Sequence, residues 1–245
     1  MIQQDRVGFL LRFLIFVLVL SLLSGLLVGV GCYASPQISA TGQLYDSAPI
    51  TVVLDAGHGG EDGGAVGVSG VCEKDLNLSI TLILRDLLVA NGVNVVLTRE
   101  DDRLLYDRNV NYHGRKKALD LAARKKIAEE TPNAVFVSIH MNSYPQAQYK
   151  GLQVWYSPNE ARSEEIATRV QERVAANMQP ENGRSIKRAT SSIYLLHRLQ
   201  IPAILIECGF LSNAEDCARL EDPAYQRQLA LQIMLALCET TAPPN

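Results

Sequence analysis

Two histidines and two glutamates stand where apolar runs give way to glycine or small polar residues. Three of them, His58, His140 and Glu207, each end a short apolar run, and Glu73 opens a predicted helix. Imidazole and carboxylate groups are poor core residues and good metal ligands. Two His and one Glu form a catalytic zinc set with an open fourth position, and a second Glu can serve as base for the water. These residue types predict a zinc hydrolase.

Each of these residues also has a plainer explanation when it is taken alone. His58 could be a solvated histidine in a turn, and Glu73 could only complement the dipole of a helix N-terminus. Asp75 is a rival ligand, or it could cap the same helix. An unpaired buried carboxylate at Glu207 would be costly, so a cation or a metal-bound water is expected beside it. The four residues together favour the metal site.

Polar residues next to these four have predicted supporting roles. Asp55 is expected to orient the ring of His58 from the end of the preceding strand. Asn142 and Ser143 directly follow the strand that ends at His140, and they are predicted to line a substrate cleft. They are also candidate contacts for the substrate oxyanion.

The remaining histidines and a cluster of basic residues are predicted to be exposed to solvent. His113 and His197 lie among charged or polar neighbours and are predicted to be solvated. A basic cluster is interpreted as the solvent-exposed face of a helix. Contact with an anionic glycan or an anionic membrane surface is the alternative. The cluster consists of Lys116, Lys117, Arg124, Lys125 and Lys126.

The chain contains 5 cysteines, and no pair has Cys-x-x-Cys spacing. This pattern argues against a disulfide framework or a structural zinc site. Cys72 and Cys208 each adjoin a candidate site glutamate. Because neighbouring residues on a strand point to opposite faces, both are predicted to be buried apolar residues rather than ligands.

The N-terminal region differs from the rest of the chain. Residues 13–31 form a run of 19 residues without a charge, long enough to cross a bilayer. Arg6 and Arg12 precede the run, and the next basic residue is Lys74, which predicts a cytoplasmic N-terminus and an exported remainder. A cleaved signal peptide and lipidation of Cys32 are the alternatives to a membrane anchor.

The length of 245 residues suits one sizeable domain with a short appendage. We predict an anchor or signal at 1–31, a linker at 32–49 and a catalytic domain at 50–240. The formal net charge of −3 and the dispersed basic residues argue against a nucleic-acid partner.

Strand and helix signals alternate through the predicted domain. This alternation predicts a single three-layer α/β domain, with a mainly parallel twisted sheet flanked by helices. In such sheets, sites gather at the carboxyl ends of the strands. Strands are expected at 51–55, 93–98, 134–140, 152–157 and 203–207, and helices at 76–90, 114–130, 161–178 and 223–237.

Three ordered blocks resemble the signature blocks of a known family. They are VLDAGHGGEDGGA at 53–65, SIHMNS at 138–143 and ECGFLSN at 207–213. These blocks resemble the zinc-dependent N-acetylmuramoyl-L-alanine amidases of the amidase-3 type, and the similarity extends from Ile50 to about Leu237.

The resemblance implies one zinc ion bound by His58, Glu73 and His140, with Glu207 as catalytic acid/base. The substrate would be peptidoglycan, cleaved at the amide between N-acetylmuramic acid and L-alanine. A related zinc peptidase or carboxypeptidase, and a catalytically silent wall-binding protein, are the competing hypotheses.

A single predicted anchor and a compact catalytic domain without wall-binding repeats resemble the germination-specific amidases of spore-forming bacteria. This implies action on spore cortex, so that muramic-δ-lactam can form, with the domain in the forespore intermembrane space. A vegetative wall amidase is the alternative. A protein activator is expected because uncontrolled wall cleavage would kill the cell, but no residue identifies one.

Overall fold

The structure is a computed structural model that describes residues 50–107, 109 and 112–241. The predicted anchor at 1–31 and linker at 32–49 lie outside these residues. Within the described ranges, no helix combines the length and the apolar character needed to cross a bilayer.

Six strands form one mixed sheet in the order β2-β1-β3-β6-β4-β5. β2, β1, β3 and β6 are parallel, whereas β4 is antiparallel to β6 and parallel to β5. The sheet is therefore mixed but mainly parallel, as predicted, with four of its five strand pairs parallel. The antiparallel pair arises at β4, which β3 reaches through a loop without a helix. The strands are β1 Thr51–Ala56, β2 Asn94–Leu97, β3 Ala134–Asn142, β4 Gln153–Tyr156, β5 Lys187–Arg188 and β6 Ala203–Phe210.

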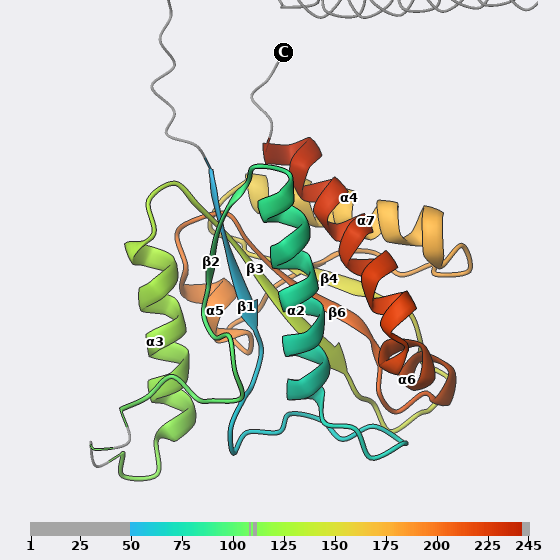
Figure 1. The fold of residues 1–245 in the computed structure, drawn as a ribbon, viewed down its shortest axis with the longest axis horizontal. Coiled ribbons are helices and arrows are strands. Elements are labelled where there is room, and N and C mark those ends of the chain that lie inside the picture. The colour runs from blue at the N-terminus through green and yellow to red at the C-terminus, as the bar shows by residue number, and fades with distance from the viewer. Residues whose placement is uncertain (1–49, 108, 110–111, 242–245) are drawn as a thin grey trace, which may run out of the picture. The chain divides into compact units, whose positions relative to one another are not determined.

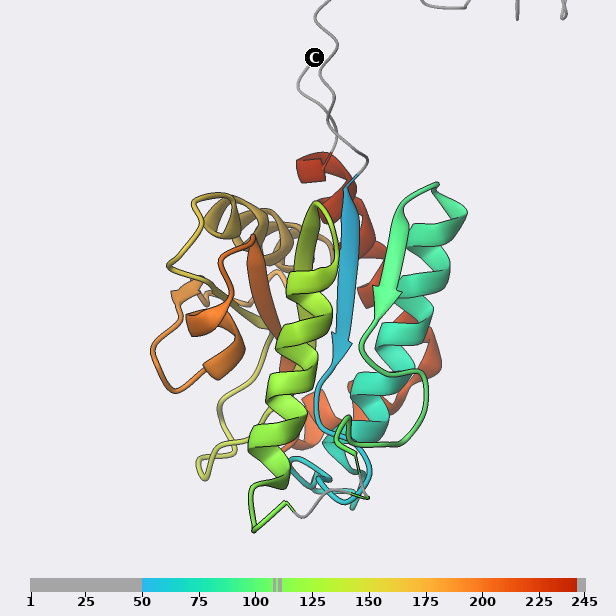
Figure 2. The ribbon, with the colours of Figure 1, turned by 90° about the vertical axis from the view of Figure 1, so that its left-hand side faces the viewer.

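Helices cover both faces of the sheet, as the alternating pattern predicts. β1 runs between α3 and α2 (Figure 2), and α2 and α7 lie side by side in front of the sheet (Figure 1). β5, α5 and α6 were not predicted, because segments this short carry little periodicity. The helices are α2 Glu73–Ala90, α3 Lys116–Glu130, α4 Arg162–Met178, α5 Tyr194–Arg198, α6 Ala214–Glu221 and α7 Pro223–Thr241.

The two faces of the sheet differ in composition. One face, here called the core face, joins alternate strand residues to α2, α4 and α7 in the larger apolar cluster, for example Val137, Ile80 and Ile233. The other, here called the site face, carries a smaller apolar cluster against α3 and α5. Towards the carboxyl ends of the strands, the site face becomes polar, with Ser138 and His140 on β3.

Candidate metal centre

The first histidine of the centre stands in a tight loop after β1. His58 has a positive φ of 61°, followed by Gly59 at 134° and Gly60 at 56°. A non-glycine residue in this left-handed region is uncommon, so surrounding contacts must hold the backbone there. The loop lies at the arrowhead end of β1, beside the first turn of α2 (Figure 1).

Two buried arginines provide those contacts. Arg99 donates from Nε to the Ala56 carbonyl at 2.9 Å, and from Nη2 to the carbonyls of Gly57 at 3.0 Å and Lys74 at 2.9 Å. Arg124 donates from Nη2 to the His58 carbonyl at 2.6 Å. Both side chains are only 1% exposed. Arg99 thus ties the His58 loop to the start of α2, which carries Glu73.

The prediction that Arg124 lies on the solvent-exposed face of its helix is wrong. Its guanidinium lies between Asp55, at 2.5 Å, and Asp120, at 2.7 Å. The spacing of Asp120 and Arg124, four residues apart on α3, is the sequence signal that could have indicated an ion pair. Lys117 and Lys126 of the same cluster are exposed, as predicted.

Two glycines allow the metal-binding candidates to approach one another. A Cβ added at Gly57 would overlap the imidazole of His140, and one at Gly64 would meet Glu73 Oε2 and lie 2.9 Å from His58 Cδ2. Glycine is required at both positions because backbone and side chain approach too closely for any other residue.

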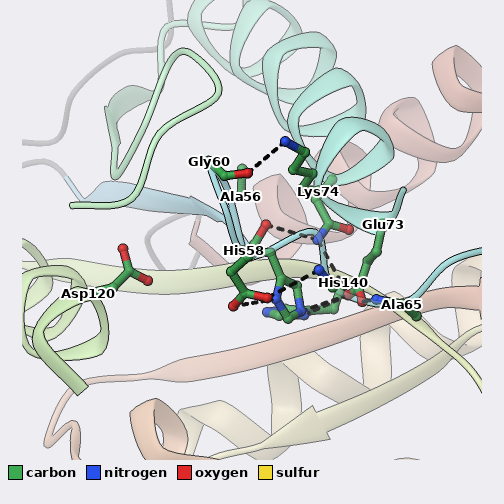
Figure 3. A network of polar contacts seen from close by, with 12 residues as sticks. Ala56, His58, Gly60, Ala65, Glu73, Lys74, Asp120 and His140 are labelled. Carbon is green, nitrogen blue, oxygen red and sulfur yellow. Dashed lines mark hydrogen bonds and ion pairs between the residues drawn. The ribbon is translucent and has the colours of Figure 1, made fainter. Parts of the chain in front are cut away.

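The side chains of His58, Glu73 and His140 converge on one point (Figure 3). Glu73 Oε1 lies 3.0 Å from His140 Nδ1 and 3.3 Å from His58 Nε2. The two imidazole rings meet edge to face with centroids 5.0 Å apart. One nitrogen or oxygen from each residue lies within 4.8 Å of the others. This geometry would let all three residues contact a single ion.

The Glu73 carboxylate is fixed by the backbone. Oε2 accepts from the Ala65 N–H at 2.8 Å, and Oε1 accepts from the Met141 N–H at 3.0 Å. Burial alone would raise the pKa of Glu73, but its hydrogen bonds with His140 and His58 and their charges lower it far below the usual range. Glu73 is therefore ionised and held in place, as a ligand to a cation needs to be.

The partner of His58 Nδ1 is Asp62, not Asp55. Asp62 Oδ2 lies 2.9 Å from Nδ1. Burial would lower the pKa of His58, but Glu73 and Asp62 together raise it. The prediction that Asp55 orients this ring is wrong, because hydrogen bonds from Thr98 and Ser138 and the ion pair with Arg124 occupy the Asp55 carboxylate.

Glu207 lies beside this cluster on the adjacent strand. It is the register partner of His140 across the parallel pair β3–β6, so both side chains occupy the site face. Its Oε2 is buried and accepts no hydrogen bond from the described residues. Burial, the largest influence, and the Glu73 charge raise the pKa of Glu207 to about 7, against the opposing effect of His140 and His58. A carboxyl with this pKa can both accept and donate a proton near neutral pH.

The other candidate residues lie around this centre. Asn142 ends β3 and is partly exposed, and Ser143 is exposed; their contact with substrate stays a prediction. Asp75 is exposed and is not among the clustered donors, and Cys72 occupies the N-cap of α2. The predictions of Asp75 as a rival metal ligand and as the helix cap are therefore both wrong.

The predicted roles of the other histidines and of Cys208 are confirmed. His113 and His197 are exposed. Cys208 is 1% exposed and belongs to the apolar cluster of the core face, on the opposite side of β6 from Glu207. The prediction that Cys72 is buried as well is wrong, because Cys72 is partly exposed at the N-cap of α2.

The donor set fits a divalent metal. Two imidazoles and a fixed carboxylate are the ligand types that zinc prefers, and three protein ligands leave a position for water or substrate. The unpartnered Oε2 of Glu207 stands next to this group rather than within it. Fold and site thus define an α/β protein with a three-residue cluster that could hold a metal ion at the carboxyl ends of its parallel strands.

Comparison with known protein families shows which family this chain belongs to. Residues 52–239 match the family described as N-acetylmuramoyl-L-alanine amidase. The chain belongs to this family, and it is an amidase of peptidoglycan. The match covers nearly all of the described residues, including both histidines and both glutamates of the site.

Individual relatives support the same assignment. The chain is 36% identical over 182 residues to the germination-specific N-acetylmuramoyl-L-alanine amidase of Bacillus subtilis (strain 168), covering 74% of this chain and 76% of that protein. It is 29% identical to the amidase LytC of the same organism, over 75% of this chain but 34% of LytC.

A solved structure is similar as well. The CwlD amidase from Clostridioides difficile, in complex with the GerS lipoprotein, is 40% identical, with a TM-score of 0.73. The alignment covers 78% of this chain and 97% of that chain.

Proposed function

We propose that this amidase acts on spore cortex peptidoglycan, with His58, Glu73 and His140 as ligands of one zinc ion and Glu207 as the catalytic acid/base. The observation that carries the proposal is the convergence of the three donor atoms within 4.8 Å, with Glu207 in register beside His140. The bond cleaved joins the lactyl carboxyl of muramic acid to the L-alanine nitrogen.

Bound zinc would supply Lewis-acid polarisation of the amide carbonyl and would favour ionisation of water. Glu207 takes the proton from the attacking water and passes it to the leaving amine nitrogen. A raised pKa suits both steps, because the group must be a base in the first and an acid in the second. Glu73 stays ionised throughout, and its carboxylate accepts from the N–H groups of Ala65 and Met141, which hold it beside both imidazoles.

The cortex role is supported by the similarity to the germination-specific amidase of Bacillus subtilis. A vegetative wall amidase is the second candidate, favoured by the similarity to LytC. The complex of the C. difficile relative with a lipoprotein supports our expectation of a protein activator. We further propose that residues 13–31 anchor the chain, with the catalytic domain outside the cytoplasmic membrane; cleaved secretion is the alternative.

The amidase chemistry is tested by mass spectrometry of muropeptides after the full-length chain is incubated with peptidoglycan, with and without zinc. We expect zinc-dependent release of intact stem peptides and a free lactyl carboxyl on the glycan. Cleavage within the peptide would instead identify a peptidase, and zinc-independent release would contradict the metal assignment.

The cortex role needs a separate measurement in spores. Spores that lack this chain should contain no muramic-δ-lactam, and the wild-type chain should restore it whereas the Glu207→Gln variant should not. Normal lactam content without the chain would favour the vegetative role.

A further inference from the structure

The end of β6 carries an irregularity that changes which side chains face the site. Register partners are His140 with Glu207 and then Asn142 with Phe210, so two steps along β3 match three along β6. The extra residue is a β-bulge, and it reverses the alternation beyond it. Phe210 therefore shares the site face with Asn142 and Glu207, which a regular strand would not allow.

Arg184 is fixed against this repositioned ring. Its guanidinium carbon lies 4.5 Å from the Phe210 ring centroid. Nε donates to the Lys150 carbonyl at 3.0 Å, and Nη1 donates to Gln153 Oε1 at 2.9 Å. Gln153 is the register partner of Glu207 across the β4–β6 pair, which places both on the site face. The guanidinium is thus held one strand away from Glu207.

The charge of Arg184 is not matched by a carboxylate. Arg184 lines a cavity of about 120 Å³ with two other basic residues, Lys150 and Arg219, and with two acidic residues, Glu181 and Asp216. Glu181 lies 3.7 Å from Arg219, and Asp216 accepts hydrogen bonds from backbone N–H groups, so neither is paired with Arg184. Lys150 pairs with Glu215 at 3.0 Å, and Arg219 pairs with Glu215 at 2.6 Å. Within the described part of the chain, no carboxylate lies within 4.0 Å of the Arg184 guanidinium, and its Nη2 donates no hydrogen bond. A half-buried, oriented cation of this kind is suited to an incoming anion.

We propose that Arg184 binds a free carboxylate on the peptide side of the substrate. This inference rests on the proposed amidase chemistry at Glu207. The lactyl carboxyl of the sugar is already part of the scissile amide, so free carboxylates at the cleavage point belong to the stem peptide. The peptide therefore leaves the centre across β6 towards β4, over Phe210.

Two exposed tyrosines extend this path. Tyr149 lies 5.9 Å from the Arg184 guanidinium carbon, and its ring meets Tyr144 edge to face at 5.1 Å. They are 42% and 49% exposed, so they form an aromatic wall beside the cation rather than part of the core. Such a wall excludes water from one side of an Arg–carboxylate pair and strengthens it.

The test compares one substrate in two forms, a disaccharide tetrapeptide with free peptide carboxylates and the same compound with those carboxylates amidated. Full-length wild type, Arg184→Gln and the control Arg169→Gln, an exposed change on α4 outside this cavity, are assayed with zinc content measured. We expect Arg184→Gln to raise KM for the free acid by about 10- to 100-fold, the effect of losing a charge-assisted hydrogen bond. The KM for the amidated substrate should hardly change in Arg184→Gln, and Arg169→Gln should behave as wild type on both substrates.

An equal loss on both substrates, at normal zinc content, would show a structural role and overturn the proposal. Titration of the released acidic tetrapeptide into the protein tests the same subsite without turnover. Wild type should bind the acid more tightly than its amide, and Arg184→Gln should not distinguish them. Equal binding of acid and amide by wild type would overturn the carboxylate subsite, whereas loss of cleavage alone would count only against the amidase chemistry.

Discussion

The core face and the site face are formed by the same strands, but the first carries apolar side chains and the second carries the charged groups of the site. On β3, Val135 and Val137 point into the larger apolar cluster, while Ser138 and His140 point to the other side. On β6, Cys208 is buried in the core face, and its neighbour Glu207 stands in the site. The period of two along each strand allows one face to stabilise the fold and the other to hold charges.

The two faces differ most clearly in the charged side chains that they bury. The core face buries mainly apolar side chains, which stabilise by about 25 cal/mol per Å² removed from water. The site face buries Asp55, Arg99, Asp120 and Arg124 in one connected network that ends on the carbonyls of the His58 loop. Buried ion pairs are weak evidence of stability, so the network is better explained by positioning.

The largest effect is expected when a donor of the metal centre is removed. His140→Ala should lose both zinc and turnover, since two remaining ligands hold zinc poorly. His197→Ala, at an exposed histidine of α5, is the matched control and should retain both. Metal content by plasma mass spectrometry checks this prediction. Full zinc occupancy in His140→Ala would remove His140 from the ligand set.

The buried pair of the site face should make stability depend on pH. Burial would raise the pKa of Asp55, but Arg124 and hydrogen bonds from Ser138 and Thr98 outweigh it and lower the pKa. The stabilisation is therefore present above the unfolded pKa of about 3.9 and is lost as the pH falls through the lower folded value.

Asp55→Asn should lower the free energy of unfolding by about 3 kcal/mol at neutral pH, because Arg124 loses a buried partner. Denaturant titrations at several pH values should show this deficit narrowing below pH about 4. A deficit that stays constant across the acid range would contradict the pKa direction.

A change on the core face should separate stability from metal binding. Leu84→Ala removes a fully buried side chain of α2 and should cost about 2–5 kcal/mol of unfolding free energy. Val89→Ala, on the same helix but 56% exposed, should cost far less. Zinc affinity of the folded Leu84→Ala protein should be unchanged; a marked loss would mean that the two faces are not independent.

The smallest of these effects is expected at Arg99, which contacts backbone carbonyls rather than the metal position. Arg99→Gln should weaken zinc affinity by about 10- to 100-fold, as loss of a group that orients ligands does. Arg169→Gln, an exposed change on α4, is the control. Competition with a chelator measures the affinity. An unchanged value would show that the His58 loop is held without Arg99.

Local sequence signals predicted most strands and helices, and they placed His140 and Glu207 near the ends of their strands. The predicted strand ends were too early, because β3 continues to Asn142 and β6 to Phe210. Local signals succeed because strand alternation, apolar periodicity and glycine-marked turns are properties of short segments. Glu73 was expected to open the following helix, and α2 begins there, three residues before the apolar periodicity expected at 76–90.

Features that depend on contacts between distant segments were not predicted. The burial of Arg124 requires Asp55 from another strand, and the direction of β4 depends on its pairing with β6. The bulge that turns Phe210 towards the site exists only in the register with β3. Asp62 could have been found as a neighbour of His58, because it lies four residues further along the same loop.

The most direct test of the metal amidase on the site face is Glu207→Gln, assayed for zinc content and release of stem peptides together. Glu207 lies beside the donor cluster and not within it, so the variant should bind zinc as wild type does while turnover falls by about 10²–10⁴-fold. The exposed change Glu172→Gln on α4 should alter neither quantity. Near-normal turnover in Glu207→Gln would contradict its role as acid/base, and loss of zinc would make it a ligand instead.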